Sequence, residues 1–368
     1  METFYSKEDL EKISLEATAV GSLPHTSPEK AVKLIFNNFS SFPFWPQLSN
    51  INPLEDMIIQ YSENFPGLTL DIQNQNFKFE SDTEEFYNKL EELYLDYDAI
   101  VLENDTDRLD KYAIKAPYST SIKLFLEKIK ETRPKFAKGQ ITGPFTWGTS
   151  VCDNEKKCLF YEDTYRDIVL KILTLKALWQ IKAIKSASPE TIPVIFMDEP
   201  TLAQIGTSAF LTVPKNTIIQ NLQEISSIIN RSGALCGVHC CGKADWKTIL
   251  ESGINILSFD AFAFIKNLAI FSNEINSFIK NHGIIAWGIV PTLDVEALRK
   301  CDSNTLVKKL EDGFNILEKK GLDKTLILKH SIITPSCGAG SLDEELAEKA
   351  MTLTSEISHY FKIKYKGI

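Results

Sequence analysis

The chain has 368 residues, of which 43% are hydrophobic and 24% are charged, a composition typical of a globular enzyme with a sizeable core. Its formal net charge of −9 argues against a nucleic-acid partner, because the neutralisation of phosphates needs a basic surface. No apolar run approaches the roughly 20 residues of a membrane-spanning helix, so we expect no membrane partner.

The N-terminal stretch METFYSKEDLEKISLEA is charged and has no apolar centre, unlike a signal peptide. We therefore expect a cytoplasmic protein. In a reducing compartment, cysteines are thiols or metal ligands more often than disulfides, and the chain has seven. Four of the seven are interpreted as plain thiols, namely Cys152, Cys158, Cys236 and Cys301.

The first third of the chain has few regular patterns. TAVGS (18–22) predicts a first strand, and a helix follows over 27–38 with Pro28 in its first turn. LTLDI (68–72) predicts a second strand. The acidic stretch 84–98 predicts a helix within an insertion around residues 73–130, in an otherwise single domain that covers residues 1–368.

From residue 134 onward, apolar runs alternate with helical stretches. Runs that are apolar nearly throughout are typical of parallel strands buried on both faces. The predicted strands cover 135–143, 192–198, 234–240, 254–260, 284–290 and 324–333. The predicted helices include 165–186, 214–230, 268–281 and 304–320.

Alternating strands and helices indicate βαβ units and a parallel α/β sheet. Eight predicted strands in one chain favour a closed (β/α)8 barrel, the TIM-barrel fold, over an open doubly wound sheet. The open sheet is the alternative, but the GSLP that ends the first strand is not the Gly-rich dinucleotide-binding fingerprint.

Polar residues stand where the predicted strands end. In a (β/α)8 barrel all these ends open on one face, where the active site is built, so we expect the side chains to converge. They are Ser22, Asp198, Glu199, His239, Asp260 and Cys337.

The stretch VHCCGKADW points to a metal. Side chains alternate between the two faces of a strand, so His239 and Cys241 share one face while Cys240 lies on the other. With Cys337 they offer one imidazole and two thiolates, a ligand set that suits Zn²⁺, and Asp260 is the best candidate for a fourth ligand. The alternative is a core histidine with buried thiols, which is the usual state of an isolated H-x-C. Three soft ligands at separate strand ends favour the zinc site.

Four motifs occur in order along the chain, namely AVGSLPHT (19–26), MDEP (197–200), VHCC (238–241) and TPSCG (334–338). Together they resemble the catalytic barrel of the cobalamin-independent methionine synthase family. That family shares a superfamily with uroporphyrinogen decarboxylase and the methylcorrinoid:coenzyme M methyltransferases. The resemblance spans nearly the whole chain. It implies a (β/α)8 barrel and zinc held by His239, Cys241 and Cys337, with Asp260 in place of the family's glutamate ligand.

The resemblance also implies a substrate site beside the metal. Asp198 matches the position that binds the amino group of the amino-acid substrate, and we expect it to take part in catalysis. Ser22 matches a contact to the substrate carboxylate, and Glu199 is assigned to the same site. Gln60, or the neighbouring Ile59, stands where the family has a further substrate-binding carboxylate.

Two departures from the family bear on the methyl donor. The family has an essential histidine after the seventh strand, where this chain reads WGIVPT, and the chain lacks the N-terminal half of full-length methionine synthases. His330, or His25, could supply the proton from another strand end. A methyl group on cobalt needs no such acid, so the missing histidine slightly favours a methylated corrinoid protein over methyltetrahydrofolate.

We therefore predict a zinc-dependent S-methyltransferase that methylates a small thiol, homocysteine, to give methionine. One alternative is a methylcorrinoid:coenzyme M-type methyltransferase, and another is a uroporphyrinogen decarboxylase-like enzyme. A non-enzymatic zinc-binding regulatory or storage protein is the third.

Overall fold

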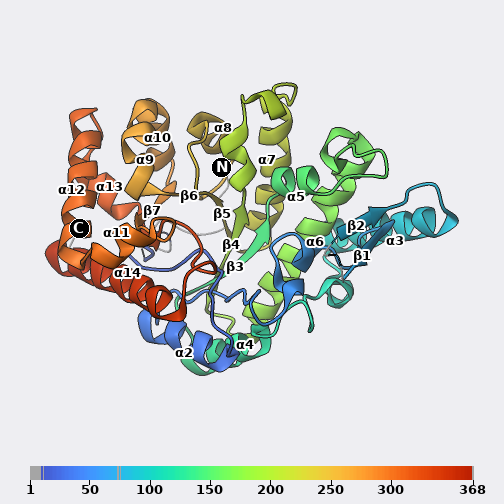
Figure 1. Ribbon diagram of the computed structural model, residues 1–368, viewed down its shortest axis with the longest axis horizontal. Coiled ribbons are helices and arrows are strands. Elements are labelled where there is room, and N and C mark those ends of the chain that lie inside the picture. The colour runs from blue at the N-terminus through green and yellow to red at the C-terminus, as the bar shows by residue number, and fades with distance from the viewer. Residues whose placement is uncertain (1–9, 11, 73, 75, 367–368) are drawn as a thin grey trace.

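The computed structural model describes residues 10, 12–72, 74 and 76–366, and Figure 1 shows its helices and strands. Within these residues the centre of the fold is a six-stranded parallel sheet whose strands pair in chain order, from β3 at one edge to β8 at the other. The sheet consists of β3 (Phe136–Thr142), β4 (Ile192–Asp198), β5 (Leu235–Cys240), β6 (Ile256–Phe259), β7 (Ile284–Val290) and β8 (Ser331–Pro335).

These strands form because their residues are apolar on both faces, and nearly every position in them is buried. One face packs against the helices through side chains such as Ile195, Val238 and Trp287. The other face, with Phe196 and Leu235, belongs to a second apolar cluster. Strand alternation therefore assigns each polar residue near a strand end to one of two environments.

The sheet curls into a half-barrel, so the prediction of a closed eight-stranded barrel is wrong. Two extended segments lie against its edges, and they make isolated bridges instead of ladders: Ala17 with Ile333 of β8, and Phe44 with Lys138 of β3. The segment around Phe44 carries prolines at positions 43 and 46, which have no N–H to donate. The predicted first strand, 18–22, is likewise no regular strand.

Helices connect successive strands and cover the outside of the sheet (Figure 1). Between β3 and β4 lie α5 (Pro144–Ser150) and α6 (Asp163–Ala187), and α7 (Lys215–Arg231) leads to β5. The later helices are α8 (Trp246–Leu250), α9 (Ala261–Leu268), α10 (Ser272–Lys280), α11 (Val295–Lys300), α12 (Ser303–Lys319), α13 (Lys324–Lys329) and α14 (Glu344–Lys364).

The predicted last strand, 324–333, divides into two elements. Its first half forms α13, which begins after Asp323, whose side chain accepts a hydrogen bond from the backbone N–H of Leu326. The N-terminal cap decides in favour of the helix, although the residues themselves are apolar enough for a strand. Only the second half joins the sheet, as β8.

The first third of the chain is built differently from the sheet. After α2 (Pro28–Asn38), the predicted second strand is β1 (Leu68–Asp71) of an antiparallel hairpin with β2 (Asn76–Phe79), so its assignment to the barrel is wrong. The predicted acidic helix is confirmed as α3 (Glu84–Glu103), and α4 (Ile122–Thr132) follows it. The single-domain organisation stays a prediction, although one apolar cluster extends from Leu15 to Phe361.

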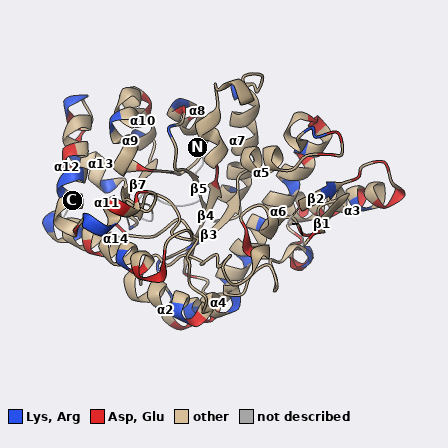
Figure 2. Ribbon diagram, in the orientation of Figure 1, with Lys and Arg blue, Asp and Glu red and all other residues tan. Residues whose placement is uncertain are grey.

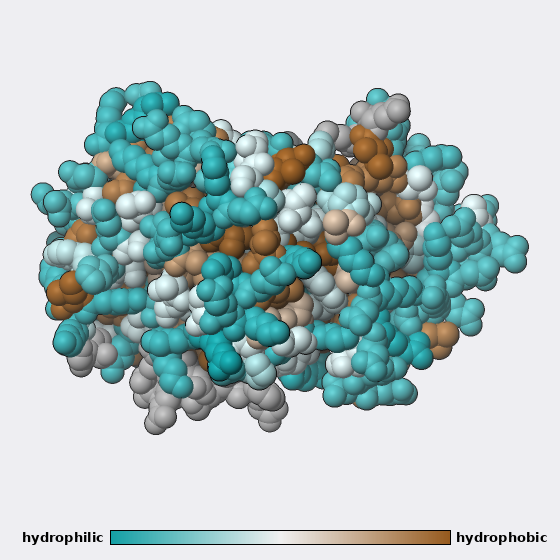
Figure 3. All heavy atoms as spheres, turned by 90° about the horizontal axis from the view of Figure 1, so that it is seen from below, coloured by the Kyte–Doolittle hydropathy of each residue, from teal (hydrophilic) through white to brown (hydrophobic). Residues whose placement is uncertain are grey.

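Charged residues occur mainly on the helices and loops around the sheet (Figure 2). The face seen from below carries mostly hydrophilic side chains with apolar patches between them (Figure 3). Among the helices that the structure describes, none is both long and apolar enough to cross a membrane.

Candidate metal centre

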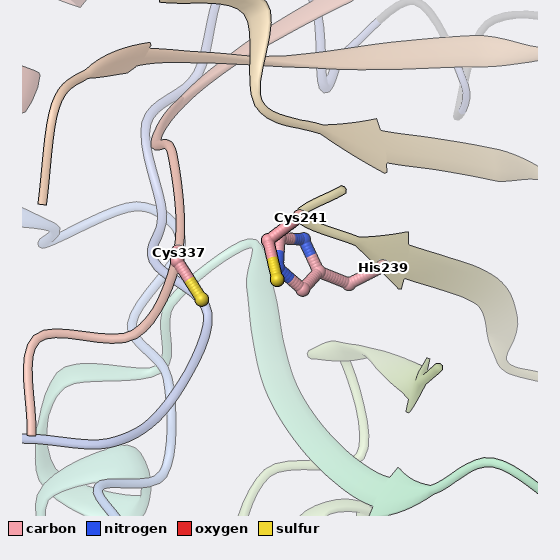
Figure 4. A group of neighbouring side chains, drawn as sticks. All are labelled: His239, Cys241 and Cys337. Atoms are coloured by element: carbon pink, nitrogen blue, oxygen red, sulfur yellow. The ribbon is translucent and has the colours of Figure 1, made fainter. Parts of the chain in front are cut away.

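Three of the predicted ligands come together at the carboxyl ends of the strands. His239 lies in β5, Cys241 directly follows that strand, and Cys337 lies in the loop after β8. One ligand atom from each side chain lies within 4.8 Å of the other two. Figure 4 shows the Cys337 sulfur pointing from its separate loop toward the end of β5. The fold therefore joins residues almost a hundred positions apart into one His/Cys/Cys group.

His239 is held in one orientation by its neighbour on β6. Its Nδ1 is 2.9 Å from the hydroxyl oxygen of Ser258, which stands opposite it in the parallel register. The other ring nitrogen, Nε2, is buried and has no hydrogen-bond partner among the described residues. A hydrogen bond at one nitrogen that leaves the second for a metal is the usual arrangement of a histidine ligand.

Cys337 is fixed by two hydrogen bonds to one residue at the end of β7. The hydroxyl oxygen of Thr292 accepts from the Cys337 N–H at 3.0 Å and donates to the Cys337 carbonyl oxygen at 3.0 Å. These bonds clamp the backbone on both sides of the Cys337 side chain. The loop is thereby preorganised, and the sulfur keeps its position beside Cys241.

The two sulfurs of the group polarise each other. A hydrogen bond from Cys337, assisted by His239, lowers the pKa of the Cys241 thiol to about 4, and the same bond raises the pKa of the Cys337 thiol. Cys240 lies outside the group in the apolar cluster on the helix side of the sheet, where burial raises its thiol pKa to about 12. The side chains thus alternate as the sequence predicts, with Cys241 in the group and Cys240 on the other face of the strand.

The donor set fits zinc. On a tetrahedral Zn²⁺ with Zn–S bonds of about 2.3 Å, two sulfur ligands lie about 3.8 Å apart, which is compatible with the 4.8 Å within which the three ligand atoms lie here. The buried and unpartnered Nε2 of His239 would supply the imidazole donor, and the lowered pKa of Cys241 favours the thiolate that a metal ion needs. His239, Cys241 and Cys337 could therefore hold a metal ion.

Asp198 ends β4 beside this group, opposite His239 in the strand register. Burial raises the pKa of its carboxyl to about 6, against the opposing effects of Lys138 and His239. Its Oδ1 is buried and accepts no hydrogen bond from any residue in the described part of the chain. A buried carboxylate oxygen without a donor is a binding position for a cationic or hydrogen-bonding ligand group.

Glu199, the next residue, has a different task. One carboxylate oxygen accepts from the Phe145 N–H at 2.9 Å, and the other accepts from the Thr146 N–H and hydroxyl at 2.8 and 2.6 Å. Both oxygens thus accept hydrogen bonds from the first turn of α5, which lies in the segment GPFTWG (143–148). Burial raises the pKa of Glu199 to about 7. Its placement favours positioning of α5 over the predicted contact with substrate.

Ser22 packs against the loop that carries Cys337. Its carbonyl oxygen accepts from the Ala339 N–H at 2.9 Å, and its hydroxyl accepts from the Gly340 N–H at 3.3 Å. A side chain at Gly338 would collide with the Ser22 hydroxyl, which explains the glycine in TPSCG. The predicted proximity of Ser22 to the metal loop is therefore present, while its contact with substrate stays a prediction.

Asp260 and Gln60 are not in the metal group. Asp260 caps α9, where its Oδ1 accepts from the Ala263 N–H at 2.8 Å, so its role as fourth ligand stays a prediction. Gln60 is buried with its amide used inside the protein: its Oε1 accepts from Gln47 at 2.6 Å, and its Nε2 donates to the Tyr118 carbonyl at 2.8 Å. These bonds argue against a free substrate contact for Gln60.

His330 lies away from the metal group, so its role as the proton donor stays a prediction. It directly follows α13 and precedes β8, at the amino end of that strand. Cys337 follows the carboxyl end, and a five-residue strand separates the two ends by roughly 16 Å. The alternative, His25, is fully buried with its Nε2 at 3.6 Å from Glu348 of α14.

Sequence reasoning missed three residues that support the site. Ser258 and Thr292 act through single hydroxyl groups, for which the sequence carries no distinctive signal. Lys138 is fully buried in β3, donates to the Val20 carbonyl and to Gln140 Oε1, and has its pKa lowered to about 8 by burial. A lysine inside a predicted strand was a signal available from the sequence.

No protein-family model matches the chain, and no curated protein matches it either. The class of the protein therefore rests on its own structure, which is a parallel β/α half-barrel with a largely buried His/Cys/Cys group.

Proposed function

We propose that the chain is a zinc-dependent methyltransferase that methylates the thiol of homocysteine. The observation that carries the proposal is the convergence of His239, Cys241 and Cys337 at the carboxyl ends of the strands, with the His239 Nε2 unpartnered. Zinc bound there would keep a substrate thiol deprotonated and nucleophilic at neutral pH.

Asp198 is the proposed binding group for the substrate amine. Its unpartnered carboxylate oxygen lies among buried groups, and an ammonium ion is the partner that favours its charged form. The pairing would fix the amino acid at the end of β4, next to His239 in the register. Homocysteine is therefore preferred over thiols without an amine, coenzyme M included.

Ser22 and the Cys337 loop form the other side of the proposed substrate site. Their hydrogen bonds to each other fix a hydroxyl group and a turn rich in glycine beside Cys337. The Ser22 hydroxyl accepts in its bond with Gly340, so its proton can be donated to a small carboxylate. In this arrangement Ser22 orients the carboxylate while Asp198 holds the amine.

The proposed donor is a methyl group on a corrinoid. A nitrogen-bound methyl group leaves well only when a general acid protonates the nitrogen, an effect typically worth about 10²–10⁴-fold in rate. The segment after β7 contains no histidine, and His330 lies at the opposite end of its strand. A cobalt leaving group needs no proton, so the carboxyl-end residues suit it better.

The test compares methylcobalamin with methyltetrahydrofolate at equal concentrations, with homocysteine as the acceptor and zinc-loaded protein. We expect methionine from methylcobalamin and little or none from the folate. Faster turnover with the folate would overturn the donor assignment. Zinc binding without turnover of either donor would indicate the regulatory or storage function.

A further inference from the structure

The loop between α5 and the short 3-10 helix Leu159–Tyr161 holds two cysteines face to face. Cys152 and Cys158 form an isolated antiparallel bridge, and their sulfur atoms are 2.7 Å apart. Backbone hydrogen bonds enclose the pair: the Asp153 N–H donates to the Lys157 carbonyl, and the Leu159 N–H donates to the Val151 carbonyl, each at 2.9 Å. The cysteines thus occupy the non-hydrogen-bonded position, where opposed residues approach most closely.

The turn that joins the cysteines is held without any covalent bond. Asp153 Oδ1 accepts from the N–H groups of Glu155 and Lys157, both at 2.9 Å, and Lys156 adopts a positive φ of 63°. These contacts bring the ends of the turn together in the reduced protein. Closure of a bond between the sulfurs therefore requires almost no rearrangement of the backbone.

The pair is open to small molecules from solvent. Both cysteines are half-buried, and residues 154–157 of the turn are exposed. Burial, followed by the contact with Cys152, raises the pKa of the Cys158 thiol to about 12. Both sulfurs nevertheless lie where a small reagent can reach them, beside each other at the edge of an exposed turn.

The loop is connected through α5 to Glu199, which directly follows β4 beside the metal group. It follows α5, whose first turn is bound by Glu199 through Phe145 and Thr146. The last residue of α5, Ser150, donates to the Thr146 carbonyl at 2.7 Å. A bond across the loop would therefore fix the chain directly after the helix that Glu199 positions.

We propose that Cys152 and Cys158 form a reversible disulfide, which makes this loop a redox-sensitive modification site. Exposed disulfides that close short loops are the labile ones in proteins, and the oxidant fitting this site is a low-molecular-weight disulfide such as oxidised glutathione. None of the residues of the metal group takes part.

The chemistry is two successive thiol–disulfide exchanges. The thiolate of one cysteine attacks one sulfur of oxidised glutathione, the S–S bond breaks, and the departing glutathione thiolate takes up a proton. The second cysteine then loses its proton and attacks the sulfur of the first, which breaks the mixed disulfide and releases a second glutathione. The protein dithiol is oxidised by two electrons, and one glutathione disulfide is reduced to two thiols.

The test is peptide mapping of the whole chain after incubation in glutathione redox buffers, acid quenching and alkylation. Trypsin cleaves after Lys156 and Lys157, so the disulfide would hold peptide 139–156 to peptide 158–166. We expect this linked pair to accumulate and to disappear on reduction, while the half-buried Cys301 remains open to alkylation. The readout is covalent and independent of zinc content and methyl transfer.

Single variants test the two-step exchange. Cys158→Ser and Cys152→Ser are each expected to trap a glutathione adduct on the remaining cysteine of the pair and to give no linked peptides. Cys301→Ser is the matched control and should still give the linked peptides. A wild-type protein that accumulates adducts without linked peptides, or in which Cys301 reacts as fast as the cysteines of the pair, would overturn the proposal.

Discussion

His239 shows how a single residue can decide the chemistry of the centre. Its strand places it on the face opposite Cys240, and its hydrogen bond with Ser258 sets the direction of the ring. The unpartnered Nε2 would cost free energy in a purely structural histidine, since buried polar atoms are normally satisfied. The ring is therefore arranged for a ligand.

The first prediction concerns this hydrogen bond. Ser258→Ala should weaken zinc binding about 10–100-fold, because the imidazole loses the partner that orients it. Competition with a chromogenic zinc chelator measures the affinity. Ser226→Ala, at a buried serine that bonds only to backbone carbonyls, is the matched control and should leave the affinity unchanged. Equal affinities for the two variants would contradict the assigned role of Ser258.

The second prediction separates the neighbouring cysteines. Cys241→Ser and Cys337→Ser should each lose bound zinc, because hydroxyl oxygen is a much poorer ligand for the ion than thiolate. Cys240→Ser should retain it, since Cys240 lies on the helix side of β5. Elemental analysis of the purified variants gives the answer. Loss of zinc from Cys240→Ser with retention in Cys241→Ser would reverse the assignment of the two side chains.

The third prediction concerns Asp198 and pH. Its pKa of about 6 means that the negative charge is present above pH 6 and is lost as the pH falls through that value. The KM for homocysteine should therefore rise below pH 6, and Asp198→Asn should raise it about 10–100-fold at pH 8, the worth of a charged hydrogen bond. A KM change of the same size with 4-mercaptobutyrate, which lacks the amine, would refute the assignment.

Among the secondary-structure elements, the apolar runs predicted where most strands of the sheet lie, and the polar residues at their ends predicted the metal group. Strands β3 to β7 follow the predicted segments closely because their residues are buried on both faces. Closure of the barrel was not predictable by the same rule. It depends on how two extended segments meet the edge strands, where they form only isolated bridges among the described residues, and where Pro43 has no N–H to donate.

The same limits apply to the candidate site. His239, Cys241 and Cys337 were found because residue type and strand phase agree. The position of His330 was not predicted correctly because the segment KTLILK is apolar enough for a strand. In the structure this segment is α13, capped by Asp323. Asp260 caps α9, and aspartate is a preferred residue at that position, so its type alone did not distinguish a cap from a ligand.

The fourth prediction belongs to the loop after β8. Thr292→Val removes the hydroxyl that bonds both sides of Cys337, and it should lower the unfolding free energy by about 1–2 kcal/mol and weaken zinc binding. Denaturant unfolding and zinc competition measure the two effects. Thr354→Val, at a buried threonine whose hydroxyl bonds only within its own helix, is the control for stability. Unchanged zinc affinity would show that the clamp does not position the sulfur.

For the whole molecule, the proposed ion would be a cross-link between distant parts of the chain. It would join the end of β5 to the loop after β8, across β6 and β7. Anything that binds the folded state alone stabilises it, so zinc should raise the melting temperature, and a chelator should lower it. The stability of the fold should thus be coupled to the binding of zinc.

The most direct test is zinc K-edge X-ray absorption of the purified chain, recorded with and without homocysteine. We expect about one zinc per chain with two sulfur ligands at about 2.3 Å and lighter nitrogen or oxygen ligands at about 2.0–2.2 Å. Homocysteine should raise the sulfur count to three. A chain without zinc that is fully stable in chelator, or a zinc site whose sulfur count does not change with homocysteine, would contradict the account.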